Sequence, residues 1–227
     1  MNQKTKNAII TGAVIVAVVG GNRIYKSYFS NKPNDEKLIK KIQKEFRQKT
    51  VGLPISKEIS KEFLTYENDK YGISIRYPDN WTKFQEEKKT LGGMTNIISF
   101  LAPKRYNSDT SPETFDIGTV PAGGFTLEEI VEASRVGVKK FFEDLGASNV
   151  ELINPNKTTL AGLPAYQSKY NIDIEGGKET LQYLQVHTIK DNQAYMLGYM
   201  AEKSDYQKYL DQVKEMFDSF ELTNKEK

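Results

Sequence analysis

Two features of this 227-residue chain have residue types that bind an ion or transfer a proton: a run of acidic and amide side chains, and a single histidine. The first has the spacing that opens a calcium-binding loop, in the order Asn171, Asp173, Glu175, Gly176. The twelfth position of such a loop falls on Gln182, where calcium loops place a bidentate carboxylate. We therefore interpret the segment as a hairpin turn between two strands. A weak surface calcium contact at Asp173 and Glu175 is the second interpretation, and no other cofactor is indicated.

The second feature is His187, the only histidine in the chain. A Ser-His-Asp triad would have to use it, and one chain cannot form a multi-histidine metal site. Alternation of apolar and polar residues places it on the same face as Gln185 and Ile189, or at a sheet edge. A lone histidine in a strand is typical of a structural role.

Other catalytic signatures are missing from the sequence. With no cysteine, the chain has no disulfide, no thiolate zinc site and no cysteine nucleophile. It contains no Walker A loop, no Gly-x-Gly-x-x-Gly and no Gly-x-Ser-x-Gly motif. We therefore predict a protein that is not an enzyme.

Charge divides the chain into a basic leader and an acidic body. Residues 1–62 hold 13 Lys/Arg and 5 Asp/Glu, a net of +8, whereas residues 63–227 hold 19 and 25, a net of −6. An acidic body argues against nucleic acid as a partner. Because the basic leader includes an apolar segment, we expect its Lys and Arg side chains to pair with anionic lipid headgroups.

An uncharged apolar run, AIITGAVIVAVVGG, occupies residues 8–21. As a helix it would measure about 21 Å, short of a bilayer core of about 30 Å and typical of a signal peptide. Val precedes the candidate cleavage sites near Gly20 where a small residue is preferred, and aromatic residues extend the apolar length to residue 29. We therefore predict a retained transmembrane anchor over residues 1–30, with a cleaved signal and a soluble buried helix as alternatives. The expected lipid-facing residues are Ile9, Ile10, Val14, Ile15, Val16, Val18, Val19, Tyr25 and Tyr28.

A basic stalk and linker are expected over residues 31–62. Within it, residues 35–49 place Leu38, Ile42 and Phe46 on one stripe of an amphipathic helix. The helix either stands as a stalk that docks its stripe on the body, or lies on anionic lipid. Gly52 and Pro54 mark the linker that follows.

The body, residues 63–227, has alternating patterns typical of strands. We expect strands over residues 71–77, from Trp81, over 96–102 and over 114–120. Three more are expected over residues 160–170, 180–189 and 194–200, joined by turns at 176–177 and 190–192.

Two helices are expected between and after these strands. Thr126 and Glu129 form a capping box that opens a helix to about residue 145. Ser204 is expected to cap a last helix that buries Leu210, Val213 and Phe217. The order of elements predicts an α+β fold, a central antiparallel sheet sandwiched between helices.

Three segments of the body resemble PsbP-like domains. They are Phe63–Tyr66 with Tyr71–Trp81, the stretch Thr159–Tyr166, and the ending from Ala194-Tyr195 to Ser219-Phe220. The resemblance covers about residues 63–222 and implies a Mog1p/PsbP-like fold. Tyr71, Tyr77 and Trp81 from these segments can be considered as a ligand platform. We expect them in the core instead, since aromatic residues carry much of a core's buried area.

The resemblance also implies a function. The best-known members are extrinsic subunits of photosystem II in the thylakoid lumen, where they help retain calcium and chloride at the oxygen-evolving centre or assist assembly, and related bacterial domains are envelope lipoproteins. This implies a membrane-tethered accessory protein in photosynthesis whose partners are lipid and photosystem II subunits. The alternative is a generic envelope binding or adaptor module of the same fold with no photosynthetic role. The partner surface is not indicated by the sequence.

The side of the membrane on which the body lies is open. The family resemblance implies an extracytoplasmic or thylakoid-lumenal body. Arg23, Lys26, Lys32 and Lys37 follow the apolar run, and on the positive-inside rule they favour a cytoplasmic body.

Overall fold

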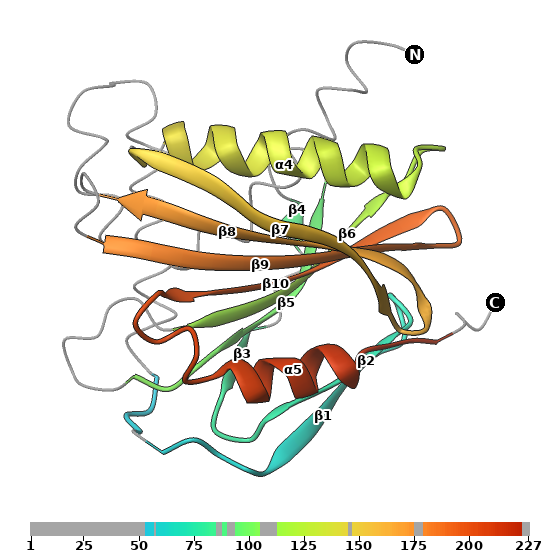
Figure 1. The fold of residues 1–227 in the computed structure, drawn as a ribbon. Helices are drawn as coiled ribbons and strands as arrows, with labels where there is room; N and C mark the ends of the chain where they lie inside the picture. Colours follow the sequence, from blue (N-terminus) through green and yellow to red (C-terminus); the bar gives the residue numbers. More distant parts are fainter. Residues whose placement is uncertain are drawn as a thin grey trace.

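A computed structural model describes residues 53–56, 58–84, 88–89, 94–104, 113–144, 147–174 and 179–223 (Figure 1). The expected anchor and the stalk and linker up to residue 52 lie outside these residues, as do Glu175 and the turn at 176–177. Within them, no helix has the length and apolarity needed to cross a membrane.

Strands dominate the described residues. They are β1 (Phe63–Asn68), β2 (Ile73–Pro78), β3 (Thr82–Phe84), β4 (Lys88–Lys89), β5 (Thr95–Leu101), β6 (Thr114–Pro121), β7 (Asn149–Leu160), β8 (Leu163–Ile174), β9 (Glu179–Lys190), β10 (Gln193–Glu202) and β11 (Glu221–Leu222). The helices are α4 (Leu127–Asp144) and α5 (Leu210–Asp218).

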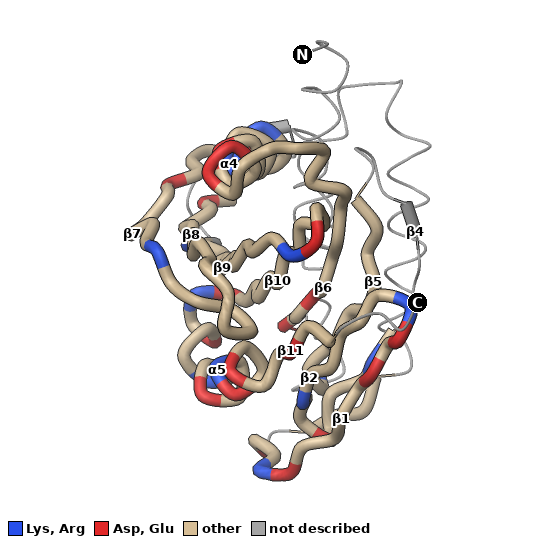
Figure 2. The backbone as a smooth tube through the Cα atoms, turned by 90° about the vertical axis from the view of Figure 1, so that its right-hand side faces the viewer, with Lys and Arg blue, Asp and Glu red and all other residues tan. Residues whose placement is uncertain are grey.

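The strands form two antiparallel sheets. The large sheet has the order β3-β5-β6-β10-β9-β8-β7, with β4 paired to β5, and the small sheet has the order β1-β2-β11. The small sheet covers part of one face of the large sheet (Figure 2). The predicted class, an antiparallel α+β fold, is therefore correct. The predicted single sheet between helices is not, because a second sheet does much of the covering.

Each face of the large sheet has its own core. On one face α4 covers β7, β8 and β9, and the cluster there includes Val138, Phe142, Ile172 and Tyr183. On the other face α5 and the small sheet pack on the sheet around residues such as Ile75, Phe100, Phe115 and Val213. Figure 2 shows α4 and α5 on opposite sides of the strands. Strands buried on both faces explain the nearly continuous apolar runs of β5 and β10.

The predicted capping box is confirmed at the start of α4. The Glu129 backbone N–H donates to Thr126 Oγ1 at 3.3 Å, and the Thr126 backbone N–H donates to Glu129 Oε2 at 2.9 Å. Each residue thus satisfies a donor of the other, which fixes where the helix begins.

The predicted cap of the last helix is wrong. Ser204 lies in a series of turns over residues 203–209, and its Oγ donates to Asp205 Oδ2 at 3.1 Å. The helix begins only at Leu210, after Tyr209, which makes no side-chain cap bond. Tyr206 and Tyr209 are buried in these turns, so packing of the two rings on the core outweighs an earlier helix start.

Strand β7 was not predicted, and the strand expected from residue 160 begins at 163 instead. Ala161 and Gly162, with φ of 51° and 72°, form a tight turn between β7 and β8. Pro155 lies within β7 where the pairing register shifts between Ile153 and Asn156. A strand at the sheet edge tolerates this proline at a bulge, although its sequence is typical of a loop.

The end of the expected linker packs on the body. Leu53 is buried against Leu101, and the Lys104 backbone N–H donates to the Pro54 carbonyl at 2.9 Å. Gln212 Nε2 of α5 donates to the Ser60 carbonyl at 2.7 Å. These contacts tie Leu53, Pro54 and Ser60 to the body, although the boundary was predicted at residue 63.

Candidate functional site

A cleft of about 360 Å³ lies between α5 and strands β7, β8 and β9. Buried apolar side chains from β7, β9 and the helix form its floor, namely Leu160, Leu184, Val186 and Val213. Leu210 and Phe217 form an apolar wall on α5 and are only partly buried. Both were predicted to face the core completely. Their remaining exposure leaves apolar surface that a ligand can cover.

Polar side chains surround this apolar floor. Lys169 and Gln167 project from β8, Thr158 and Thr159 from β7, and Lys214 and Asp218 from α5. An apolar floor with a few polar groups at the rim is the usual composition of a binding pocket.

Lys169 is the most unusual of the rim residues. Its Nζ lies 4.2 Å from the centre of the Tyr206 ring, a cation–π contact. Burial lowers the pKa of Lys169, and the charge of Lys203 lowers it further. Both effects destabilise the ammonium form, and a carboxylate placed beside it would offset them, because an opposite charge nearby favours the charged form of a lysine.

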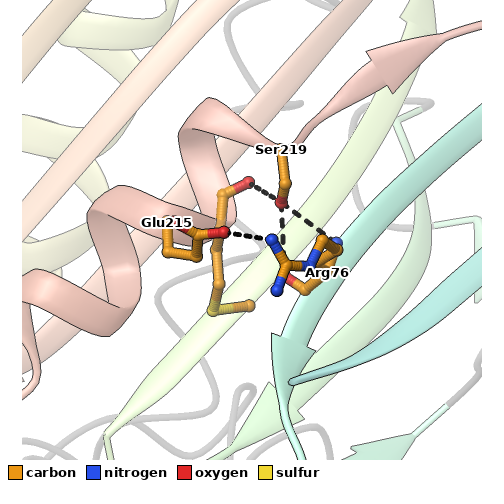
Figure 3. A network of polar contacts seen from close by, with 4 residues as sticks. Arg76, Glu215 and Ser219 are labelled. Carbon is orange, nitrogen blue, oxygen red and sulfur yellow. Dashed lines mark hydrogen bonds and ion pairs between the residues drawn. The ribbon is translucent and has the colours of Figure 1, made fainter. Parts of the chain in front are cut away.

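The opposite flank of α5 is fastened to the small sheet. Arg76 Nη1 of β2 donates to Glu215 Oε1, and the Arg76 backbone N–H donates to Ser219 Oγ at 3.0 Å (Figure 3). Phe217 packs on Phe115 of β6 with ring centres 5.0 Å apart. These contacts hold α5 at its C-terminal half, and the cleft is therefore formed before any ligand binds.

A row of four polar residues and one glycine crosses the large sheet on its α4 face. Register places Ser99, Asp116, Gly198, Gln185 and Ser168 side by side on five consecutive strands. All five are buried. Buried polar side chains need hydrogen-bond partners, and Gln185 and Ser168 find partners on α4.

Gln185 is the centre of the bonding in this row. Its Nε2 donates to Tyr183 Oη at 2.7 Å, and its Oε1 accepts from Ser134 Oγ of α4 at 3.2 Å. Arg135 Nε donates to Ser168 Oγ at 3.4 Å. Burial is the main cause that raises the pKa of Tyr183, with Asp116 contributing. The row thus joins α4 to the sheet and is enclosed, so we assign it a structural role.

His187 lies in the central strand β9, on the same face as Gln185, as one of the two predicted alternatives stated; it does not lie at a sheet edge. It is 3% exposed, and burial lowers its pKa to about 4, with the charge of Arg135 lowering it further. A neutral, enclosed imidazole agrees with the predicted structural role.

Asp173 lies near the end of β8, and Glu175 lies outside the described residues. Asp173 Oδ1 accepts from Thr180 Oγ1 at 2.7 Å, and Oδ2 accepts from Asn149 Nδ2 at 3.3 Å. These bonds link three strands, as expected beside a hairpin. The described ranges contain no cluster of three or more potential metal ligands. The calcium contact stays a prediction.

Two of the three aromatic residues that were considered as a ligand platform belong to the core. Tyr77 and Trp81 are buried, and Trp81 packs edge-on against Tyr209 with ring centres 5.6 Å apart. Tyr71 is partly buried against the same cluster. The cleft residues, in contrast, were not predicted. The one signal for them was the apolar stripe of α5, whose residues were all expected in the core.

Comparison with known proteins relates the chain to one family. A family model described as PsbP-like protein matches residues 8–222. The fold is similar to the solution structure of cyanobacterial PsbP (CyanoP) from Synechocystis sp. PCC 6803. That match has 16% identity and a TM-score of 0.54, and it covers 76% of this chain and 98% of that chain. No curated protein matches by sequence.

Two further solved structures match with TM-scores below 0.5. LpqN of Mycobacterium tuberculosis, involved in cell envelope biogenesis, has 13% identity and a TM-score of 0.49, covering 72% of this chain and 91% of that chain. The Ran-binding protein Mog1p of Saccharomyces cerevisiae has 10% identity and a TM-score of 0.49, covering 72% and 96%.

Proposed function

Because the chain belongs to the PsbP-like protein family, we propose that it is a non-enzymatic accessory protein, tethered to a membrane, that binds a larger membrane complex. The observation that carries this proposal is the cleft beside α5, which is apolar at its floor, polar at its rim and formed in advance. A preformed cleft of this composition supports binding, since its ordering cost is low before any partner arrives.

The chemistry of the cleft also favours binding over catalysis. Its polar lining consists of two lysines, one aspartate, one glutamine, two threonines and Tyr206, whose ring is in contact with the Lys169 ammonium. The single histidine and the buried Asp116 belong to the opposite face of the large sheet. An acid and a base poised around one reacting atom are what catalysis by proton transfer needs.

The membrane tether is the second part of the proposal. Its support is the apolar run at residues 8–21 with its aromatic extension, and the family match begins within this run at residue 8. We propose a body on the extracytoplasmic or lumenal side, on the family resemblance. The basic residues after the run favour the other side, so protease protection in vesicles of known orientation decides the matter.

Photosystem II is the complex that the family resemblance implies, and we propose it as the partner on that ground. The shared fold with CyanoP at a TM-score of 0.54 agrees with this choice. Fold alone does not assign a partner, since function resides in sites carried by a fold. If the chain co-purifies with another envelope complex, the generic adaptor alternative is the better description.

Affinity purification of the tagged full chain from its own membranes tests the proposal. We compare wild type with Gln167→Trp, which fills the cleft from β8, and with Val136→Trp, which adds the same side chain to an exposed site on α4. The proposal expects a defined membrane complex with wild type and Val136→Trp, and its loss with Gln167→Trp. Equal recovery of the complex with Gln167→Trp would show that the cleft is not the binding site.

A further inference from the structure

The outer edge of β7 runs beside the cleft. In the described part of the chain β7 ends the large sheet and pairs only with β8. Its last residues, Thr158 to Leu160, line the cleft. An edge strand presents unpaired backbone N–H and C=O groups along its outer side. Backbone hydrogen-bonding groups and an apolar cleft are therefore next to each other.

A register shift divides β7 into two regularly paired halves, and the second half is the one beside the cleft. The register shifts between Ile153 and Asn156, and Asn154 has a φ of 42°. From Asn156 to Leu160 the pairing with β8 is continuous. Five residues of strand span about 17 Å, enough for a short extended segment to pair along them. The bulge and Pro155 limit pairing beyond this stretch. Bulges and prolines often have this effect on the edge strands of natural sheets.

The charges at the rim of the cleft indicate which kind of peptide segment would bind there. Two basic residues, Lys169 and Lys214, lie at the rim, and Asp218 is the one acidic residue among the described residues of the cleft lining. Lys214 pairs with Asp211 on the helix surface at 3.3 Å, whereas the Lys169 ammonium rests on the Tyr206 ring. Lys169 is also the less exposed of the two lysines, so a carboxylate bound beside it would lie in surroundings that exclude part of the solvent. The chain's own basic stalk is a poor occupant, because residues 35–49 carry more Lys/Arg than Asp/Glu.

We propose that the edge of β7 and the α5 cleft together bind an extended, acidic peptide segment of a protein partner. The segment adds to residues 156–160 as a further strand, places an apolar side chain between Leu210 and Phe217, and directs a carboxylate to Lys169. Addition of a strand at a sheet edge beside a groove is a common mode of peptide recognition, in which main-chain bonds give affinity and side-chain pockets give specificity. This inference rests on the proposed function, since it names the chemistry of the partner.

Selection from a library of random peptides about twelve residues long tests the proposal, with the full chain held in lipid nanodiscs. We expect the selected peptides to alternate apolar and acidic residues. Methylation of alternate backbone amides in a selected peptide should weaken binding about tenfold, because it removes main-chain donors. Lys169→Glu and Gln167→Trp should each weaken binding by a similar factor, and Val136→Trp should leave it unchanged.

Four results would overturn the proposal: no enriched sequence, basic peptides, equal binding to Gln167→Trp, or binding unaffected by N-methylation. These results are distinguishable from failure of the proposed function. If Gln167→Trp abolishes co-purification of a complex but no peptide is selected, the cleft binds its partner in another form. If a peptide binds as expected but no complex co-purifies, the peptide site stands and the accessory role does not.

Discussion

Arg76 and Ser219 are 143 residues apart in sequence, yet the Arg76 backbone N–H donates to Ser219 Oγ at 3.0 Å (Figure 3). Ser219 directly follows α5, and Arg76 is in the middle of β2. The bond, together with the Arg76–Glu215 ion pair, fastens the helix to the small sheet on the side away from the cleft. The shape of the cleft therefore depends on contacts that no ligand touches.

Ser219→Ala should lower the free energy of unfolding by about 1 kcal/mol, because it leaves a backbone donor of β2 without its acceptor. Ser204→Ala is the matched control and should cost less than about 0.5 kcal/mol, since Ser204 caps no helix. Urea denaturation of both variants measures the difference. Equal losses of unfolding free energy in the two variants would mean that the hydrogen bond from Arg76 to Ser219 does not stabilise the fold.

Stability should fall as the pH is lowered from about 6.5 to 4, and His187 should account for part of the loss. Burial holds the pKa of His187 at about 4 in the folded chain, against 6.5 for an ordinary histidine. Between these values the unfolded chain binds a proton that the folded chain does not, so stability rises with pH across this window.

The expected contribution of His187 is about 3 kcal/mol between pH 4 and pH 7. His187 is the only histidine, so the difference between wild type and His187→Gln isolates it from the carboxylates. The difference in unfolding free energy between the two proteins should change with pH through this window. A constant difference would show that His187 is protonated equally in both states.

Gln185→Leu should destabilise the fold by about 2–3 kcal/mol, because it leaves Ser134 Oγ and Tyr183 Oη buried without this partner. Gln167→Leu makes the same chemical change at the cleft rim, where Gln167 is partly exposed, and should change stability by less than about 0.5 kcal/mol. Thermal unfolding of both variants gives the comparison. A neutral Gln185→Leu would mean that the polar row does not organise the sheet.

A fragment of residues 53–227 should unfold cooperatively and should be more stable than one of residues 63–227. The shorter fragment loses the burial of Leu53 and the bond from Gln212 to Ser60, together worth about 2–3 kcal/mol. Calorimetry on both fragments tests this. Equal melting temperatures would place the boundary at residue 63, as the sequence predicted.

The sequence predicted the elements whose local signals agree with their final environment. The capping box at Thr126 and the turn at Asp191-Asn192 are local devices, and both are present in the structure. Alternation also placed His187 on the face of Gln185. In each case the interactions that determine the local structure involve residues only a few positions apart in the sequence.

Strand β7 and the start of α5 were beyond prediction because tertiary packing decides them. The stretch from Asn154 to Lys157 is typical of a loop, and only pairing with β8 makes it a strand. Tyr206 and Tyr209 delay the helix by packing on the core. Since the cleft is built from β7 and α5, the candidate site could not be found before both elements were placed.

Photo-crosslinking from the edge of β7 in native membranes tests the central claim most directly. Thr159→p-benzoylphenylalanine places the reactive group at the cleft, and Val136→p-benzoylphenylalanine places it on the exposed side of α4. We predict one dominant crosslinked membrane protein from position 159, absent from position 136 and lost when Gln167→Trp is added. The same crosslinks from both positions, or a crosslink from position 159 that survives Gln167→Trp, would contradict the claim that this cleft holds the partner.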